Sequence, residues 1–269
     1  MIEPIGPSKH CSCGELFVDC AYWIKVKKRF FELREGMDNL PFEFPFFKFF
    51  VNRYPLVAYR RIIAYLLSLG IDVEKIPGAG RFNKVLRENE LLMQAVLEVD
   101  NNRVFFDSSK PIYHGVFFSA SKKYRTYLLW LIRDPRAQSV SALKYNNWTL
   151  EYAANHWIKE YELTKRLLVR GNYAHLPISY EAFCRNPRNT LDAINDFADL
   201  GIEEWDLNFR RKTLHVMGNY GTRIANKSSA IEERSEWVQK IDTEQRRSLE
   251  RQLKKYRHLF SETVPPLVD

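Results

Sequence analysis

Apolar and polar residues recur along the chain at spacings that predict a mostly helical protein with a few short strands. Segments with apolar residues every three to four positions indicate amphipathic helices. These segments are 22–35, 47–69, 84–99, 149–170, 186–200 and a last one from about 242 onward. In the second helix, which Gly70 is expected to end, the buried face should carry Val57, Ile62, Leu66 and Leu69.

Two of these helices have clear start signals. Asn186 and Pro187 suit the N-cap and the first position of the helix over 186–200. Asp242 and Gln245, three residues apart, predict a capping box at the start of the last helix.

Continuous apolar runs predict three strands. They are RVFFD (103–107), TYLLWLI (126–132) and AHLPISY (174–180). Strands that are apolar on both faces are typical of sheets covered by helices on both sides. Because strands and helices alternate here, the pattern indicates an α/β fold with a parallel sheet flanked by helices. We find no internal repeat and no linker, and we expect residues 1–269 to form a single domain.

Charge and composition narrow the class of protein only a little. The net charge of +8 favours anionic partners such as nucleotides, nucleic acid or an acidic substrate. A basic surface that only keeps the protein in solution fits the charge equally well. No apolar run is long enough to span a bilayer, the first ten residues carry no secretory signal, and four cysteines are too few for a disulfide scaffold. We therefore expect a cytoplasmic protein.

The stretch LIRDPRAQSVS (131–141) is the strongest candidate for a binding site. Arg133 stands at the carboxyl end of the second predicted strand, which is where ligands bind in open parallel sheets. Asp134 and Pro135 suit the start of the next helix, and Ser141 lies about two turns further along it. Arg133 and Ser141 could together bind one anion. Alternatively, the arginine pairs with a neighbouring carboxylate and the serine only packs.

Several stretches together resemble the sulfotransferases that use 3′-phosphoadenosine-5′-phosphosulfate (PAPS), especially bacterial members. The stretches are CSCGELFVDCAYW, VFFDSSKPIYH, LLWLIRDPRAQSVS, PISYEAFCRNPRNTLDAINDFADL and VMGNYGTRI. The resemblance implies a P-loop NTPase-like fold and transfer of a sulfuryl group from PAPS to a hydroxyl or amine of a small-molecule or glycan acceptor. It also implies that Arg133, Ser141 and Arg223 bind the 3′-phosphate of PAPS, and it implies no metal ion and no nucleic acid.

The catalytic groups follow less directly from the resemblance. Cytosolic members carry Lys-Thr-His at the strand end where this chain has DSSK (107–110). The family's assignment of the histidine as base therefore does not transfer to this chain. Lys110 could stabilise the sulfuryl or bridging oxygen, and Asp107 or His114 could act as the general base.

The family's loop for the 5′-phosphosulfate, and the first strand before it, precede the Cys-rich segment. This sequence begins ten residues ahead of Cys11, so we expect an N-terminally incomplete enzyme that lacks its first strand. The alternatives are an inactive remnant of the family and a basic nucleic-acid-binding protein.

Three clustered cysteines raise the question of a metal site. Cys11, Cys13 and Cys20 follow the spacing C-x-C-x₆-C, which lacks the CxxC pair of common zinc sites. His10 is the only nearby residue that could be a fourth ligand. We expect a turn with reduced thiols and no metal.

Overall fold

The computed structural model describes residues 11–34, 56–76, 80–108, 111–144, 147–208, 215 and 231–267. The chain forms two compact units. The first unit consists of residues 1–126 and 206–229, and the second of residues 127–205 and 230–269. The expectation of a single domain stays a prediction.

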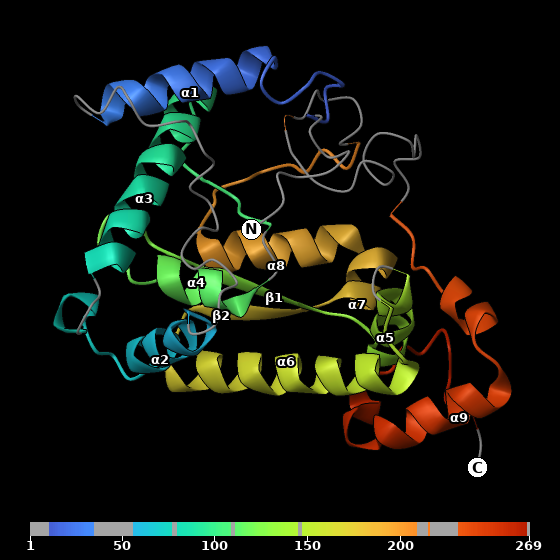
Figure 1. Ribbon diagram of the computed structural model, residues 1–269. Coiled ribbons are helices and arrows are strands. Elements are labelled where there is room, and N and C mark those ends of the chain that lie inside the picture. The colour runs from blue at the N-terminus through green and yellow to red at the C-terminus, as the bar shows by residue number, and fades with distance from the viewer. Residues whose placement is uncertain are drawn as a thin grey trace. The chain divides into compact units, whose positions relative to one another are not determined.

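The first unit is helical in the part that the structure describes (Figure 1). Its elements are α1 (Ala21–Leu33), α2 (Leu56–Ser68), the 3₁₀ turn η2 (Val73–Lys75), α3 (Gly80–Asp100) and α4 (Ile112–Phe118). Helix α1 packs on α3, and α2 packs on α4. Phe82 of α3 meets Phe117 of α4 edge to face, with ring centroids 5.1 Å apart. The helices expected over 22–35 and 84–99 are confirmed, as is the one over 47–69 from Leu56 onward.

Two expectations for this unit are wrong. Residues 103–107 form no strand; Val104 and Phe106 are 48% and 71% exposed, and no described strand pairs with them. An apolar run becomes a strand only when a neighbour takes its backbone hydrogen bonds. The buried face of α2 was also misplaced, because Ile62 and Leu69 are about half exposed, whereas Ile63 and Ala64 are fully buried.

The second unit contains a small parallel sheet. Strand β1 (Leu128–Ile132) pairs with β2 (His175–Ser179) in a register that runs from Leu128 opposite His175 to Ile132 opposite Ser179. Helices α5 (Pro135–Leu143) and α6 (Leu150–Arg170) connect the two strands. The predicted strand–helix–strand order is therefore confirmed, and the unit is α/β. The strands are not covered on both sides throughout, since Leu131 is 58% exposed.

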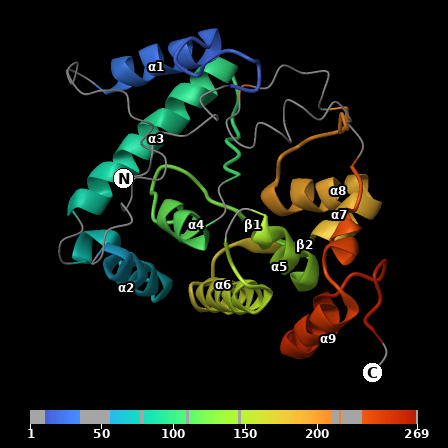
Figure 2. The same cartoon turned by 45° about the vertical axis from the view of Figure 1, so that its right-hand side comes forward.

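Helices α6 and α8 (Pro187–Ala198) lie on opposite sides of the strand pair (Figures 1 and 2). The short helix α7 (Tyr180–Arg185) follows β2 directly, and the chain then continues through η5 (Glu236–Lys240), α9 (Thr243–Gln252) and η6 (Lys254–Leu259). A hydrophobic core joins α5 and α6 to these last elements. Its buried members are Ala137, Val140, Ala154, Trp237, Leu249, Leu253, Tyr256 and Val264.

The local start signals are confirmed. Asp134 accepts a hydrogen bond from the backbone N–H of Arg136, with Pro135 in the first helical turn. Asn186 caps α8 in the same way, again with a proline beside it. Asp242 and Gln245 form the predicted capping box. None of the described helices is long and apolar enough to cross a membrane.

Candidate functional site

Arg133 lies at the edge where the two parallel strands end. It follows β1 directly, and its guanidinium carbon lies 4.7 Å from the ring centroid of Tyr180, the first residue after β2. One guanidinium nitrogen, Nη2, donates a hydrogen bond to the carbonyl of Arg234 at 3.1 Å. The Nε atom is buried and has no hydrogen-bond partner among the described residues. The Tyr180 ring and the Arg234 carbonyl therefore hold the Arg133 side chain in place, while at least one of its N–H groups donates no hydrogen bond to a described residue.

The backbone beneath Arg133 is fixed by a buried carboxylate. The N–H of Asp134 donates to Glu181 Oε1 at 2.8 Å, and the Ser179 hydroxyl donates to Glu181 Oε2 at 3.2 Å. Glu181 is only 7% exposed. These contacts tie Asp134, the second residue after β1, to Ser179 at the end of β2 and to Glu181 just beyond it, so that the ends of both strands are held together.

Arg136 takes the structural role that sequence reasoning offered as the alternative for Arg133. It is completely buried and pairs with Asp134 through Nη2 and Oδ2, 2.7 Å apart. A second ion pair joins its Nη1 to Glu250 Oε1 at 2.8 Å. No ion pair of Arg133 is found among the described residues. The arginine that pairs with a neighbouring carboxylate is thus Arg136, which the sequence had not singled out.

The same guanidinium also connects the segment after η6, residues 260–264, to α5. Arg136 Nη2 donates to the carbonyl of Val264 at 2.6 Å, and its guanidinium carbon lies 4.0 Å from the ring centroid of Phe260. The backbone N–H of Ser261 donates to Asp134 Oδ2 at 2.8 Å. The Arg136–Asp134 pair therefore holds the helix start that follows Arg133.

The other predicted site residues fall in three places. Ser141 lies exposed near the end of α5, in the same unit as Arg133. Asp107 and His114 are half-buried residues of the first unit. Lys110 and Arg223 lie outside the described residues. Joint binding of one anion by Arg133 and Ser141 stays a prediction.

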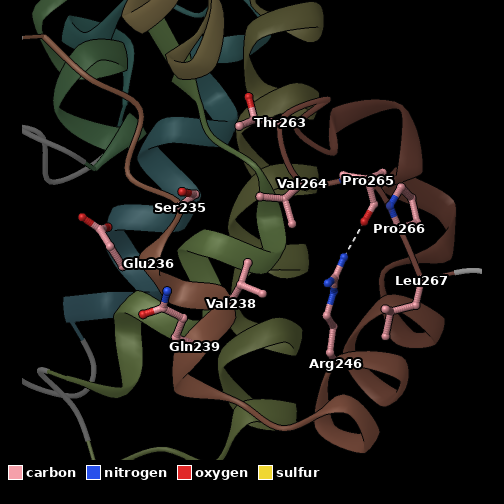
Figure 3. A pocket seen from close by; sticks show the side chains of 10 residues that line it. All are labelled: Ser235, Glu236, Val238, Gln239, Arg246, Thr263, Val264, Pro265, Pro266 and Leu267. Atoms are coloured by element: carbon pink, nitrogen blue, oxygen red, sulfur yellow. Dashed lines mark hydrogen bonds between the residues drawn. The ribbon is translucent and has the colours of Figure 1, made fainter.

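An open pocket of about 540 Å³ lies elsewhere in the second unit, between η5, α9 and the chain segment after η6 (Figure 3). Val238, Val264 and Leu267 give it apolar walls, and Arg246 donates a hydrogen bond to the carbonyl of Pro265. None of the predicted site residues lines this pocket. Arg246 already has partners in Glu250 and Pro265.

A second group of chemically capable side chains occurs in the first unit. We call it the Cys–His cluster; it consists of Cys11, Cys13, Cys20 and His215. Four potential ligand atoms, one from each residue, lie within 4.8 Å of one another. Burial raises the pKa of the Cys11 thiol to about 12. His215 was missed because it stands 195 residues after Cys20 and no local signal marks it. His10, the only candidate for a fourth ligand near the cysteines in sequence, lies outside the described residues.

Comparison with protein families, with curated proteins and with solved structures gives no match for this chain.

Proposed function

We propose that this protein is a PAPS-dependent sulfotransferase in which Arg133 and Ser141 bind the 3′-phosphate of the donor. The observation that supports this most directly is the position of Arg133. Its guanidinium lies at the carboxyl edge of two parallel strands, immediately before a helix. In open α/β sheets, that edge is where ligands bind.

The surroundings of Arg133 suit a phosphate. Arginine presents a rigid fork of N–H donors that matches phosphate oxygens. Because the Tyr180 ring and the Arg234 carbonyl already restrict the side chain, less conformational entropy is lost when an anion binds. A serine hydroxyl from the same helix region can add a further hydrogen bond.

The proposed reaction transfers SO₃ between two oxygens or from oxygen to nitrogen. The acceptor atom forms a bond to sulfur while the bond between sulfur and the bridging phosphate oxygen breaks, and adenosine 3′,5′-bisphosphate leaves. The acceptor's proton passes to a general base, for which Asp107 and His114 are the candidates. Lys110 would stabilise negative charge on the transferred group.

Isothermal titration calorimetry with adenosine 3′,5′-bisphosphate tests the proposal, with adenosine 5′-monophosphate as the comparison ligand. We expect the bisphosphate to bind more tightly, because only it carries the 3′-phosphate. Equal affinity for the two nucleotides, or binding of neither, would contradict the proposal. Steeply salt-dependent binding of unrelated single-stranded nucleic acid, with no preference for the bisphosphate, would instead favour the nucleic-acid alternative.

A further inference from the structure

We propose that the Cys–His cluster is a structural Zn²⁺ site. Three sulfur atoms and one imidazole form one of the donor sets that structural zinc sites use. All four ligand positions would come from the protein, which leaves no open position for a substrate or a reactive water. The proposal is independent of the proposed sulfuryl transfer, because that reaction needs no metal.

Three distances within the cluster are close to those of a tetrahedral zinc site. With Zn–S bonds of about 2.3 Å and a Zn–N bond of about 2.0 Å, neighbouring ligand atoms should lie about 3.5–3.8 Å apart. Cys13 Sγ and Cys20 Sγ are 3.7 Å apart. Nδ1 of His215 lies 3.3 Å from Cys20 Sγ and 3.6 Å from Cys11 Sγ. The complete set therefore needs shifts of only about 1 Å to close around one ion.

A tight turn presents the first two cysteines together. The N–H of Gly14 donates to the Cys11 carbonyl at 2.9 Å, and the N–H of Cys11 donates to the Glu15 carbonyl at 2.9 Å. Gly14 has a φ of +101°, which other residues rarely adopt. A glycine directly after C-x-C thus allows the chain to reverse while both thiols stay on the cluster side.

The third cysteine is placed by a helix. Cys20 is the N-cap residue of the 13-residue helix α1, and its side chain makes no capping hydrogen bond. The start of α1 therefore fixes the position of Cys20, and its sulfur lies with the other ligand atoms of the cluster.

His215 is held by a neighbouring ring. The Tyr22 ring stacks on its imidazole, with centroids 4.7 Å apart and planes 9° from parallel. The Tyr22 hydroxyl donates to Asp100 Oδ2 at 2.9 Å, which anchors the stacking ring to the end of α3. The stacked and anchored Tyr22 ring therefore restricts the orientation of the His215 imidazole within the cluster.

The competing uses of these thiols fit the geometry less well. All three cysteines are free, and the 3.7 Å between Cys13 and Cys20 sulfurs far exceeds the roughly 2.05 Å of a disulfide. Cys11 and Cys20 are fully buried, so neither can reach a substrate as a nucleophile. A zinc ion would link residues 11–20 to His215 and so join the two chain segments from which the first unit is assembled.

Metal analysis of the full chain, purified without chelators or affinity metals, is the first test. We expect inductively coupled plasma mass spectrometry to find one Zn²⁺ per chain. Cys20→Ser and His215→Ala should lose it during gel filtration, whereas Cys184→Ser, which changes the cysteine outside the cluster, should keep it. His215→Cys should retain zinc, because four thiolates also bind the ion tetrahedrally.

A second test uses only the unaltered protein, so it does not depend on the folding of a variant. After zinc is removed with a chelator under reducing conditions, one equivalent of Co²⁺ should produce thiolate-to-cobalt charge transfer and the strong visible bands of a tetrahedral site. One equivalent of Zn²⁺ should abolish these bands and protect three thiols from alkylation. A zinc-free protein that gives no cobalt bands, or a Cys13–Cys20 disulfide in protein purified under reducing conditions, would overturn the proposal.

Discussion

Arg136 and Asp134 form an ion pair that is almost completely removed from water, with their closest atoms 2.7 Å apart and exposed fractions of 0% and 1%. Asp134 also caps α5 and accepts the backbone N–H of Ser261, while Arg136 reaches Glu250 and the Val264 carbonyl. The pair therefore joins the start of a helix to the end of the chain. Arg133, three residues before Arg136, is close in sequence to this ion pair but takes no part in it.

Replacing Arg136 should destabilise the second unit strongly. In Arg136→Met, the side-chain volume is largely kept, but the carboxylates of Asp134 and Glu250 lose their buried cation. Breaking a buried pair in this way costs about 3–5 kcal/mol in unfolding free energy. Urea unfolding followed by circular dichroism measures the loss. Arg247→Met, at an exposed position on α9, is the matched control and should change the free energy by less than about 0.5 kcal/mol. Similar values for both variants would contradict the assigned role.

Replacing Arg133 should affect ligand binding more than folding. Arg133→Ala removes a charge-assisted contact worth about 1.5–3 kcal/mol, so we expect the affinity for adenosine 3′,5′-bisphosphate to fall at least about tenfold. Arg133→Lys keeps the charge and loses the fork, and it should restore only part of the affinity. Calorimetry gives the affinities, and Arg247→Ala controls for the change in net charge. If Arg133→Ala and Arg247→Ala bind alike, Arg133 does not contact the phosphate.

The capping box of α9 should make a measurable contribution to stability. The Asp242 side chain accepts the N–H of Gln245 at 2.8 Å, and the Gln245 side chain accepts the N–H of Asp242 at 3.0 Å. Asp242→Ala should therefore lower the unfolding free energy by about 1 kcal/mol. Asp242→Ser, which can still accept the N–H bond, should lose less. Equal losses in the two variants would mean that the charge of Asp242 matters and its capping bond does not.

Tyr173 should make stability fall at alkaline pH. Burial raises the pKa of its phenol to about 12, from an ordinary value near 10. The phenol ionises more easily in the unfolded state than in the folded state. The contribution of neutral Tyr173 to the free energy of unfolding is therefore complete below about pH 10, and it is lost as the pH rises from about 10 towards 12. Tyr173→Phe removes the ionisable group.

Urea unfolding at several pH values between 9 and 11 tests this expectation. The stability of Tyr173→Phe should decline less steeply than that of the unaltered protein. Tyr152→Phe, at a tyrosine that is 54% exposed, should follow the unaltered protein. Curves of equal slope for all three proteins would show that Tyr173 ionises with an ordinary pKa.

Features that depend on a few neighbouring residues could be predicted from the sequence. Asp134, Asn186 and Asp242 each cap a helix through a bond to a residue two or three positions away, so their role is encoded locally. The apolar runs that became β1 and β2 were recognised for the same reason. The run at 103–107 has the same local character, yet it forms no strand, because a strand also needs a partner elsewhere in the chain.

The sequence by itself determined the helix starts, the α/β order of the second unit and the position of Arg133 at a strand end. Only the tertiary structure decided that Arg136 is the buried arginine, because its partner Glu250 is 114 residues away. The tertiary structure likewise brought His215 to Cys20 across 195 residues. Local spacing carries no information about contacts at such separations, since packing of the whole chain determines which distant side chains meet.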